Sequence, residues 1–161
     1  MMKSATQTPL VSVILCTYNP HRGLLEWALD SIERQTLDKS QFEVIIVDNN
    51  SAPPFNTSSM KNTGSLSLRI IREPRQGLTF SRCAGIVDAS AELLVFMDDD
   101  NHLDPDYLEN AIAIAAKEPQ IGLYGGISRA VFERPIHSWK EKVIPHLGVR
   151  NYGPDPITSF E

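Results

Sequence analysis

Four short apolar runs, separated by segments with helical periodicity, are the feature that most constrains the fold of this chain. The runs cover residues 10–16, 42–47, 68–71 and 93–97, and polar or turn residues bound each of them. Strands that are buried on both faces of a sheet lose the alternation of polar and apolar side chains and have this pattern. The sequence therefore predicts four buried β-strands.

Three other segments have helical patterns. Residues 22–36 repeat apolar side chains at i, i+4 and i+8, as one face of a helix does. Residues 79–89 form a second candidate helix, in which Gly85 fits where the helix packs closely against a strand. We expect a third helix to have Asp104 as its N-cap and to end near Lys117. Strands that alternate with helices predict an α/β domain with a Rossmann-like, mainly parallel sheet flanked by helices.

Composition excludes several classes of protein. The chain has 15 Lys and Arg against 20 Asp and Glu, and this net charge of −5 argues against unspecific nucleic-acid binding, which depends on neutralised phosphates. The longest strictly apolar run, residues 111–116, is far shorter than the ~20 residues of a transmembrane helix. Cys16 and Cys83 have no zinc or disulfide spacing, so we expect two buried thiols in a reducing compartment. The predicted location is the cytoplasm, with peripheral attachment to a membrane in the context of a longer chain.

Polar residues follow three of the predicted strands directly. Residues 17–20 come after the first strand, residues 48–51 after the second, and residues 98–101 after the fourth. In an open α/β sheet, ligands bind beyond the carboxyl ends of the strands, which meet at one edge. The three clusters therefore predict a binding site at that edge.

The acidic triplet Asp98-Asp99-Asp100 is the strongest candidate for metal chemistry. If the strand continues through the triplet, we expect Asp98 and Asp100 to point together and Asp99 to point away, because residues i and i+2 of a strand face the same side. Two converging carboxylates repel each other unless a cation lies between them, and oxygen ligands favour Mg²⁺ or Mn²⁺. The alternative interpretation is a solvated acidic turn before the third helix.

Three other side chains are candidates for contacts with a nucleotide, and each has a structural alternative. Asp48 can accept hydrogen bonds from a base or a ribose, or form an Asx turn with the residues that follow it. Tyr18 can stack on a base or cover the edge of the sheet. Arg82 can meet a phosphate or a base carbonyl, or remain a solvated helix residue. The four histidines have no metal-ligand spacing.

Taken together, these motifs resemble those of the family 2 glycosyltransferases, which have the GT-A fold. The matching segments are Val11 to Asn19, Gln35-Thr36, Val47 to Ser51, Gly77 to Gly85, and Asp98-Asp99-Asp100. Their order and approximate spacing match the family over residues 9–130. The resemblance implies an inverting transfer of a sugar from a nucleotide-diphosphate donor, usually UDP-linked, with Mn²⁺ or Mg²⁺ as the cofactor.

The resemblance also implies roles for single residues. The nucleotide-binding residues would be Thr17, Tyr18, Asn19, Asp48, Arg82, Asp98 and Asp99. Asp48 would hydrogen-bond the uracil-like edge of the base. Asp98 and Asp100 would hold the metal, Asp100 directly. A divalent cation there would stabilise the diphosphate leaving group as its charge develops.

One part of the family pattern has no counterpart here. Family members normally continue into an acceptor-binding half that carries the general base. Glu133, Glu141 and Asp155 are acids of the later part of the chain, and none lies in a motif that matches this base. We therefore expect the catalytic base to be absent from this chain.

The expected organisation follows from this difference. Residues 1–8 are predicted to be a disordered or extended leader, residues 9–130 the donor-binding domain, and residues 131–161 the incomplete start of an acceptor-side region. Self-association through exposed apolar residues of that region is expected. These residues are Phe132, Trp139 and Ile144.

Three other functions compete with a transferase. A sugar-nucleotide pyrophosphorylase needs a phosphate loop with Gly and Arg after the first strand, which residues 17–20 do not supply. A haloacid-dehalogenase-type phosphatase needs a nucleophilic Asp there, where this chain has Cys16 and Thr17. The main alternative is a non-catalytic nucleotide-sugar-binding module or a truncated fragment without the base. The acceptor stays open between a glycan, a lipid and a protein.

Overall fold

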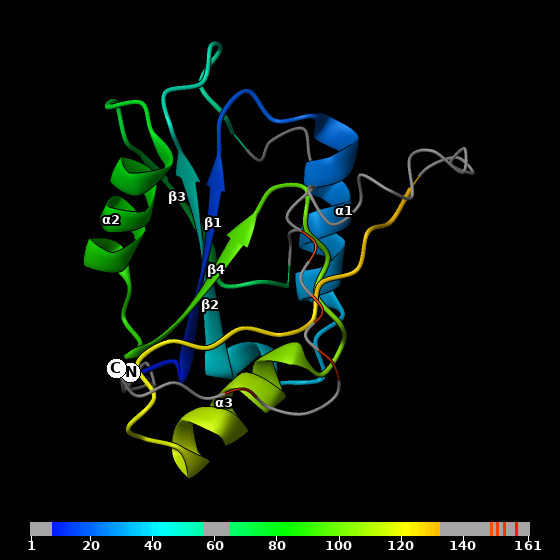
Figure 1. Cartoon of the computed structure of the whole chain (residues 1–161). Coiled ribbons are helices and arrows are strands. Elements are labelled where there is room, and N and C mark those ends of the chain that lie inside the picture. Colours follow the sequence, from blue (N-terminus) through cyan, green and yellow to red (C-terminus); the bar gives the residue numbers. More distant parts are fainter. Residues whose placement is uncertain are drawn as a thin grey trace. The chain divides into compact units, whose positions relative to one another are not determined.

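The computed structural model of the chain describes residues 8–56, 65–132, 149, 151, 153 and 157. In these residues, four strands form one parallel sheet in the order β3-β2-β1-β4 (Figure 1). The strands are β1 (Val11–Thr17), β2 (Phe42–Asp48), β3 (Leu68–Arg72) and β4 (Leu93–Asp98). The predicted α/β fold with a parallel sheet is confirmed.

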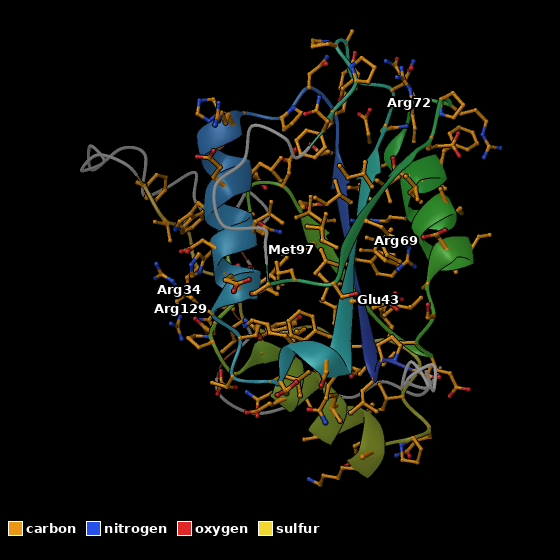
Figure 2. All side chains as sticks on the ribbon, turned by 180° about the vertical axis from the view of Figure 1, so that it is seen from behind. Arg34, Glu43, Arg69, Arg72, Met97 and Arg129 are labelled. Atoms are coloured by element: carbon orange, nitrogen blue, oxygen red, sulfur yellow. The ribbon has the colours of Figure 1, made fainter. Side chains whose placement is uncertain are left out.

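Helices cover both faces of this sheet. They are α1 (Arg22–Glu33), α2 (Leu78–Asp88) and α3 (Tyr107–Lys117), together with the 3₁₀ turn η1 (Lys39–Gln41). Helices α1 and α2 lie on opposite sides of the sheet in Figure 1, and the view from behind in Figure 2 agrees. Every residue of β1 and β2 is buried, because these two strands are central in the sheet.

Helix α1 buries the apolar face that its sequence pattern predicts. Leu25 and Leu29 are one turn apart, as are Ala28 and Ile32, and all four are buried. On the other side of the sheet, Gly85 of α2 lies so close to β1 that an added Cβ would overlap the Cγ2 of Ile14. The close packing expected at this glycine is therefore present.

The prediction of two buried thiols is wrong for Cys83, which is exposed, whereas Cys16 is buried. The buried residues of α2 are Ser81 and Gly85, which are one helical turn apart. Cys83 is two residues from each, and a rotation of about 100° per residue places it on the opposite face of the helix.

Helix α3 begins later than the sequence suggests. Its N-cap is Asp106 rather than Asp104, and the Asp106 side chain makes no capping hydrogen bond. The Tyr107 N–H donates to the Asp104 carbonyl at 3.0 Å, and the Thr36 N–H donates to the Pro105 carbonyl at 2.8 Å. These bonds hold the segment before Tyr107 in a turn, so the helix starts only after it.

A charged network lies near the amino ends of the strands. Glu43 accepts hydrogen bonds from the Ser12 hydroxyl at 2.6 Å and the Ser90 N–H at 2.7 Å, and it pairs with Arg69, which also pairs with Asp88. Figure 2 shows Arg69 and Glu43 close together beside the sheet. Burial alone would raise the pKa of Glu43, but the hydrogen bonds from Arg69, Ser12 and Ser90 outweigh it and lower the pKa to about 2.

The chain divides into two compact units, residues 1–119 and residues 120–161. The described residues of the second unit contain no helix or strand. The expected boundary between residues 130 and 131 stays a prediction. Within the described parts of the chain, no helix combines the length and the apolar character that a membrane crossing needs.

Several expectations fall on residues outside the described ones. They concern residues 1–7 of the predicted leader, Glu133, Glu141 and Asp155 as acids of the acceptor side, and Trp139 and Ile144 as surface residues. Phe132 is described and is exposed.

Candidate functional site

All four strands extend one residue beyond their predicted apolar runs, and these final residues are polar. They are Thr17, Asp48, Arg72 and Asp98. The strand register places Thr17 opposite Asp48 and Cys16 opposite Asp98. The carboxyl ends of β1, β2 and β4 therefore present their polar residues at one edge, as the sequence predicts.

A pocket of about 490 Å³ opens at this edge. Its lining residues are Cys16, Thr17, Tyr18, Asn49, Gln76, Gly77, Leu78, Ser81, Asp98, Asp99 and Asp100. The volume is in the usual range for small-molecule sites. Of the predicted site residues, the pocket brings together Thr17, Tyr18 and the acidic triplet, whereas Asn19, Asp48 and Arg82 lie outside its lining.

The three aspartates have different surroundings. Asp98 ends β4, and the next two residues form a turn, so the strand does not continue through the triplet. Asp98 and Asp100 are exposed, whereas Asp99 is half-buried and accepts a hydrogen bond from the Thr17 hydroxyl. Burial raises the pKa of Asp99 and the other two carboxylates add to this rise, although the bond from Thr17 opposes it.

The exposed pair fits a divalent cation that also binds a ligand. Among the described residues, no three His, Cys, Asp or Glu side chains converge into a complete metal cage. Mg²⁺ and similar ions do not need one, because they are usually held by one or two carboxylates together with the phosphates of a substrate. Asp98 and Asp100 would supply oxygen ligands of this kind, whereas Asp99 accepts a hydrogen bond from Thr17.

Arg82 faces the acidic triplet from α2. Its Nη2 lies 3.6 Å from Asp98 Oδ1, and its guanidinium lies over the Phe96 ring at 5.7 Å from the centroid. The Arg82 side chain is still 43% exposed, so the interpretation as a solvated helix residue stays open beside that of a ligand contact. Arg82 places a positive charge at the edge of the pocket.

Asp48 makes the Asx-type turn that was one of its two interpretations. The residue is 1% exposed, its Oδ1 accepts from the Ser51 N–H at 3.0 Å, and its Oδ2 accepts from the Phe55 N–H at 3.2 Å. The carboxylate therefore fixes the loop after β2.

Asn49 is a pocket residue that the sequence analysis missed. Its Nδ2 donates to the carbonyls of Glu73 and Arg75, and its Oδ1 accepts from the Gly77 N–H at 2.7 Å. These bonds tie the end of β2 to the segment that enters α2. Its position inside the Val47 to Ser51 motif was the sequence feature that could have predicted it as a pocket residue.

Asn19 connects the loops that follow β1 and β2. Its N–H donates to Ser51 Oγ at 2.8 Å, and its Oδ1 accepts from the Ala52 N–H at 2.9 Å. The residue has a positive φ of 46°, which Asn tolerates better than most residues. With Pro20 it lines a neighbouring cavity of about 400 Å³. Asn19 thus shapes the rim beside Tyr18.

The start of α2 forms another wall of the pocket. The sequence marked Gly77 to Gly85 as a family motif but did not predict that Gly77, Leu78 and Ser81 line the pocket. Gly77 is the N-cap, has a φ of 133°, and leaves the helix without a side-chain cap. Ser81, one turn later, is buried, and its Oγ has no hydrogen-bond partner among the residues that the structure describes. On the β1 side, burial raises the pKa of the Cys16 thiol to about 11, so it stays protonated at neutral pH.

The sequence comparison identifies the family. The model of glycosyl transferase family 2 matches residues 12–156. This chain belongs to glycosyl transferase family 2. The motif resemblance found in the sequence is therefore confirmed over most of the chain.

Named relatives are longer than this family 2 domain. The putative glycosyltransferase EpsH of Bacillus subtilis (strain 168) is 31% identical over 118 residues, which cover 71% of this chain and 33% of the relative. The validoxylamine A glucosyltransferase of Streptomyces hygroscopicus subsp. jinggangensis (strain 5008) is 27% identical over 97% of this chain and 38% of its own length. The chain thus spans about a third of the length of these relatives.

Solved structures show the same GT-A fold. The crystal structure of S. aureus TarS 1-349 in complex with UDP has a TM-score of 0.58 and 25% identity, over 68% of this chain and 32% of that one. The mannosyltransferase PcManGT from Pyrobaculum calidifontis in complex with GDP-Man and Mn²⁺ has a TM-score of 0.53 and 27% identity, over 68% and 32%.

Proposed function

We propose that this chain binds the donor of an inverting, metal-dependent glycosyl transfer, and that the donor is a UDP-sugar. One observation carries the proposal: the exposed Tyr18 ring and the acidic triplet line the same pocket at the carboxyl edge of the sheet. An aromatic face suits a nucleobase, and exposed carboxylates suit a metal-bound diphosphate. The pocket therefore has chemistry for both ends of a nucleotide diphosphate.

Asp98 and Asp100 would hold Mn²⁺ or Mg²⁺ against the diphosphate. The cation would stabilise the negative charge that develops on the leaving diphosphate. Thr17 keeps Asp99 turned inward by hydrogen bonding, which leaves the other two carboxylates exposed. Arg82 adds a positive charge beside Asp98, within reach of an anionic ligand at the pocket edge.

The base would lie against Tyr18, with Thr17 and Asn19 beside it and Asp48 at its edge. One backbone N–H donates to each Asp48 oxygen. A carboxylate oxygen has lone pairs for two hydrogen bonds, so each keeps capacity for a base N–H. Asp48 is 1% exposed and lies outside the pocket lining, so it would meet the base only where the loop that it fixes moves aside.

Related structures support a nucleotide-sugar donor. TarS has been crystallised with UDP and with UDP-GlcNAc, and PcManGT with GDP-Man and Mn²⁺. Two nucleotides therefore occur among these neighbours, so UDP and GDP are the pair that a binding test must compare.

The general base would come from outside the described residues. The carboxylates that line the pocket in the described part of the chain are those of the triplet, which the metal would occupy. A general base contributes ~100–10,000-fold in rate. None of Glu133, Glu141 and Asp155 lies in a motif that matches this base, so we expect the 161-residue chain to bind donor but transfer sugar slowly or not at all. The alternative of a donor-binding module predicts the same result.

Titration calorimetry and thermal unfolding with UDP and GDP, each with Mn²⁺ or with EDTA, test the proposal. UDP with Mn²⁺ should stabilise the fold by about 2.7 kcal/mol at a hundredfold excess over its dissociation constant. UDP should bind more tightly than GDP, and EDTA should weaken binding. The absence of nucleotide binding under every condition would refute a donor site.

The remaining parts of the proposal rest on sequence. The cytoplasm stays the predicted location, and a glycan, a lipid or a protein the predicted acceptor. Self-association also stays a prediction, and sedimentation of the purified chain over a range of concentrations tests it.

A further inference from the structure

Gln35 lies just after α1, and both the nitrogen and the oxygen of its side-chain amide are hydrogen-bonded. The residue is 5% exposed. Its Nε2 donates to the Ser31 carbonyl at 3.1 Å and to the Asp104 carbonyl at 2.8 Å, while its Oε1 accepts from the Leu108 N–H at 3.0 Å. This buried amide therefore connects the end of α1 to Asp104, which precedes α3, and to Leu108 in the first turn of α3.

Neighbouring residues strengthen the same junction. The Thr36 N–H donates to the Pro105 carbonyl at 2.8 Å, and the Ser31 hydroxyl accepts from the Leu103 N–H at 3.1 Å. Farther up α1, the Trp27 ring packs on His102 with 4.4 Å between ring centroids. Helix α1, together with Gln35 and Thr36 just after it, thus contacts residues 102–105 and Leu108.

This segment directly follows the acidic triplet. Only Asn101 and His102 separate Asp100 from Leu103, and no helix or strand begins before Tyr107. On its other side the triplet is fixed by β4, whose Asp98 pairs with β1. The triplet is therefore held at one end by the sheet and at the other by side chains of α1.

We propose that Gln35 is a positioning residue for the metal ligands, because its amide fixes the segment that follows Asp98–Asp100. The inference rests on the proposed function. Helix α1 is a rigid support, since its apolar face is buried in the core. In the proposed function Asp98 and Asp100 would share one cation despite their mutual repulsion, so loosening the segment behind them should weaken metal binding before it affects contacts to the base.

Gln35→Met tests this, because Met has a similar volume and can neither donate nor accept these bonds. Groups that orient metal ligands typically change metal affinity by ~10–100-fold when removed. In calorimetry, the variant should keep the UDP affinity of the wild type in EDTA. The gain in UDP affinity on adding Mn²⁺ should fall ~10–100-fold. The Mn²⁺ electron paramagnetic resonance spectrum should show correspondingly more free ion.

Glu43→Gln is the matched control, since it breaks a buried polar network at the amino ends of the strands, away from the pocket. Glu43→Gln should lower the free energy of unfolding. It should leave unchanged the gain in UDP affinity that Mn²⁺ produces, called the Mn²⁺ gain below. An unchanged Mn²⁺ gain in Gln35→Met, or an equal loss in both variants, would overturn the positioning role.

Two further results distinguish a failure of this inference from a variant that does not fold and from a failure of the proposed function. If Gln35→Met does not fold, Thr36→Val removes the exposed hydroxyl that donates to Glu109 at 2.8 Å and should cause a smaller loss of the same kind. An unchanged Mn²⁺ gain there would then overturn the inference. If the wild-type chain shows no Mn²⁺ gain at all, the proposed function fails, and the inference falls with it.

Discussion

Arg82 Nη2 lies 3.6 Å from Asp98 Oδ1, so the first carboxylate of the acidic triplet already has a positive charge beside it. Both side chains are about half exposed, which makes the pair a weak one. A metal ion at Asp98 and Asp100 would compete with Arg82 for the same carboxylate. A nucleotide diphosphate would give the guanidinium another anionic partner.

Arg82→Gln should therefore change metal and nucleotide binding in opposite directions. An exposed ion pair contributes ~0.2–1 kcal/mol, so Mn²⁺ affinity without nucleotide should rise by about fivefold at most. The UDP affinity with Mn²⁺ should fall. Mn²⁺ and UDP titrations measure the two effects. Arg34→Gln, which removes another exposed helical pair with Asp30, is the control and should change neither. Equal effects of the two variants would contradict the role of Arg82.

Asp100→Ala should abolish the Mn²⁺ dependence of UDP binding and leave the fold intact. Removing one of three adjacent carboxylates relieves repulsion, so the free energy of unfolding without metal should be unchanged or slightly higher. Calorimetry and urea denaturation measure the two quantities. Asp106→Ala is the control, because that carboxylate lies near the triplet in sequence, caps no helix amide and does not line the pocket. Full Mn²⁺ dependence in Asp100→Ala would show that the metal is held elsewhere.

Asp48→Asn should weaken UDP binding by ~1.5–3 kcal/mol, the contribution of a hydrogen bond to a charged group. It should also destabilise the fold, since the new amide NH₂ would face the N–H of Ser51 or Phe55. Asp38→Asn controls for the second effect, because Asp38 also accepts a backbone N–H but lies outside the pocket. An equal loss of UDP and GDP affinity would argue against recognition of the base.

Acid should destabilise the chain through Glu43. Its pKa is about 2 in the fold against an ordinary value of 4.5, so the carboxylate contributes stability that is fully present above pH 4.5 and is lost as the pH falls toward 2. The loss should be on the order of 1–3 kcal/mol. Urea denaturation from pH 7 to pH 2 measures it. Glu43→Gln should flatten the profile in part, because the pKa of Glu73 is also lowered to about 2 by Arg75. An unchanged slope in the variant would refute the assignment.

The sequence predicted the strands well because burial on both faces leaves an uninterrupted apolar run. It did not predict their final residues, since Thr17, Asp48 and Asp98 have the composition of a turn. In the structure these residues still pair with neighbouring strands, and this pairing is what sets their spacing at the pocket.

Two local predictions failed for reasons that lie outside local sequence. Asp104 has the right type and position for an N-cap, but hydrogen bonds from Gln35 and Thr36 hold its segment in a turn. Cys83 has apolar neighbours in sequence, but burial in a helix depends on the face that meets the sheet. Asn49 was missed because its partners are carbonyls of a distant segment.

The contact between Gly85 and Ile14 would give position 85 an influence on the ligand selectivity of the proposed donor site without any contact to the ligand. Helix α2 rests on β1 at Gly85, and the same helix begins at Gly77 in the wall of the pocket. A larger side chain at position 85 would overlap Ile14, so either that side chain or the helix would have to shift, and a shift of the helix would move that wall. In the proposed donor site, the width available to a purine or a pyrimidine would then be adjustable from the protein core, and position 85 would be a remote site for engineering or evolving donor preference.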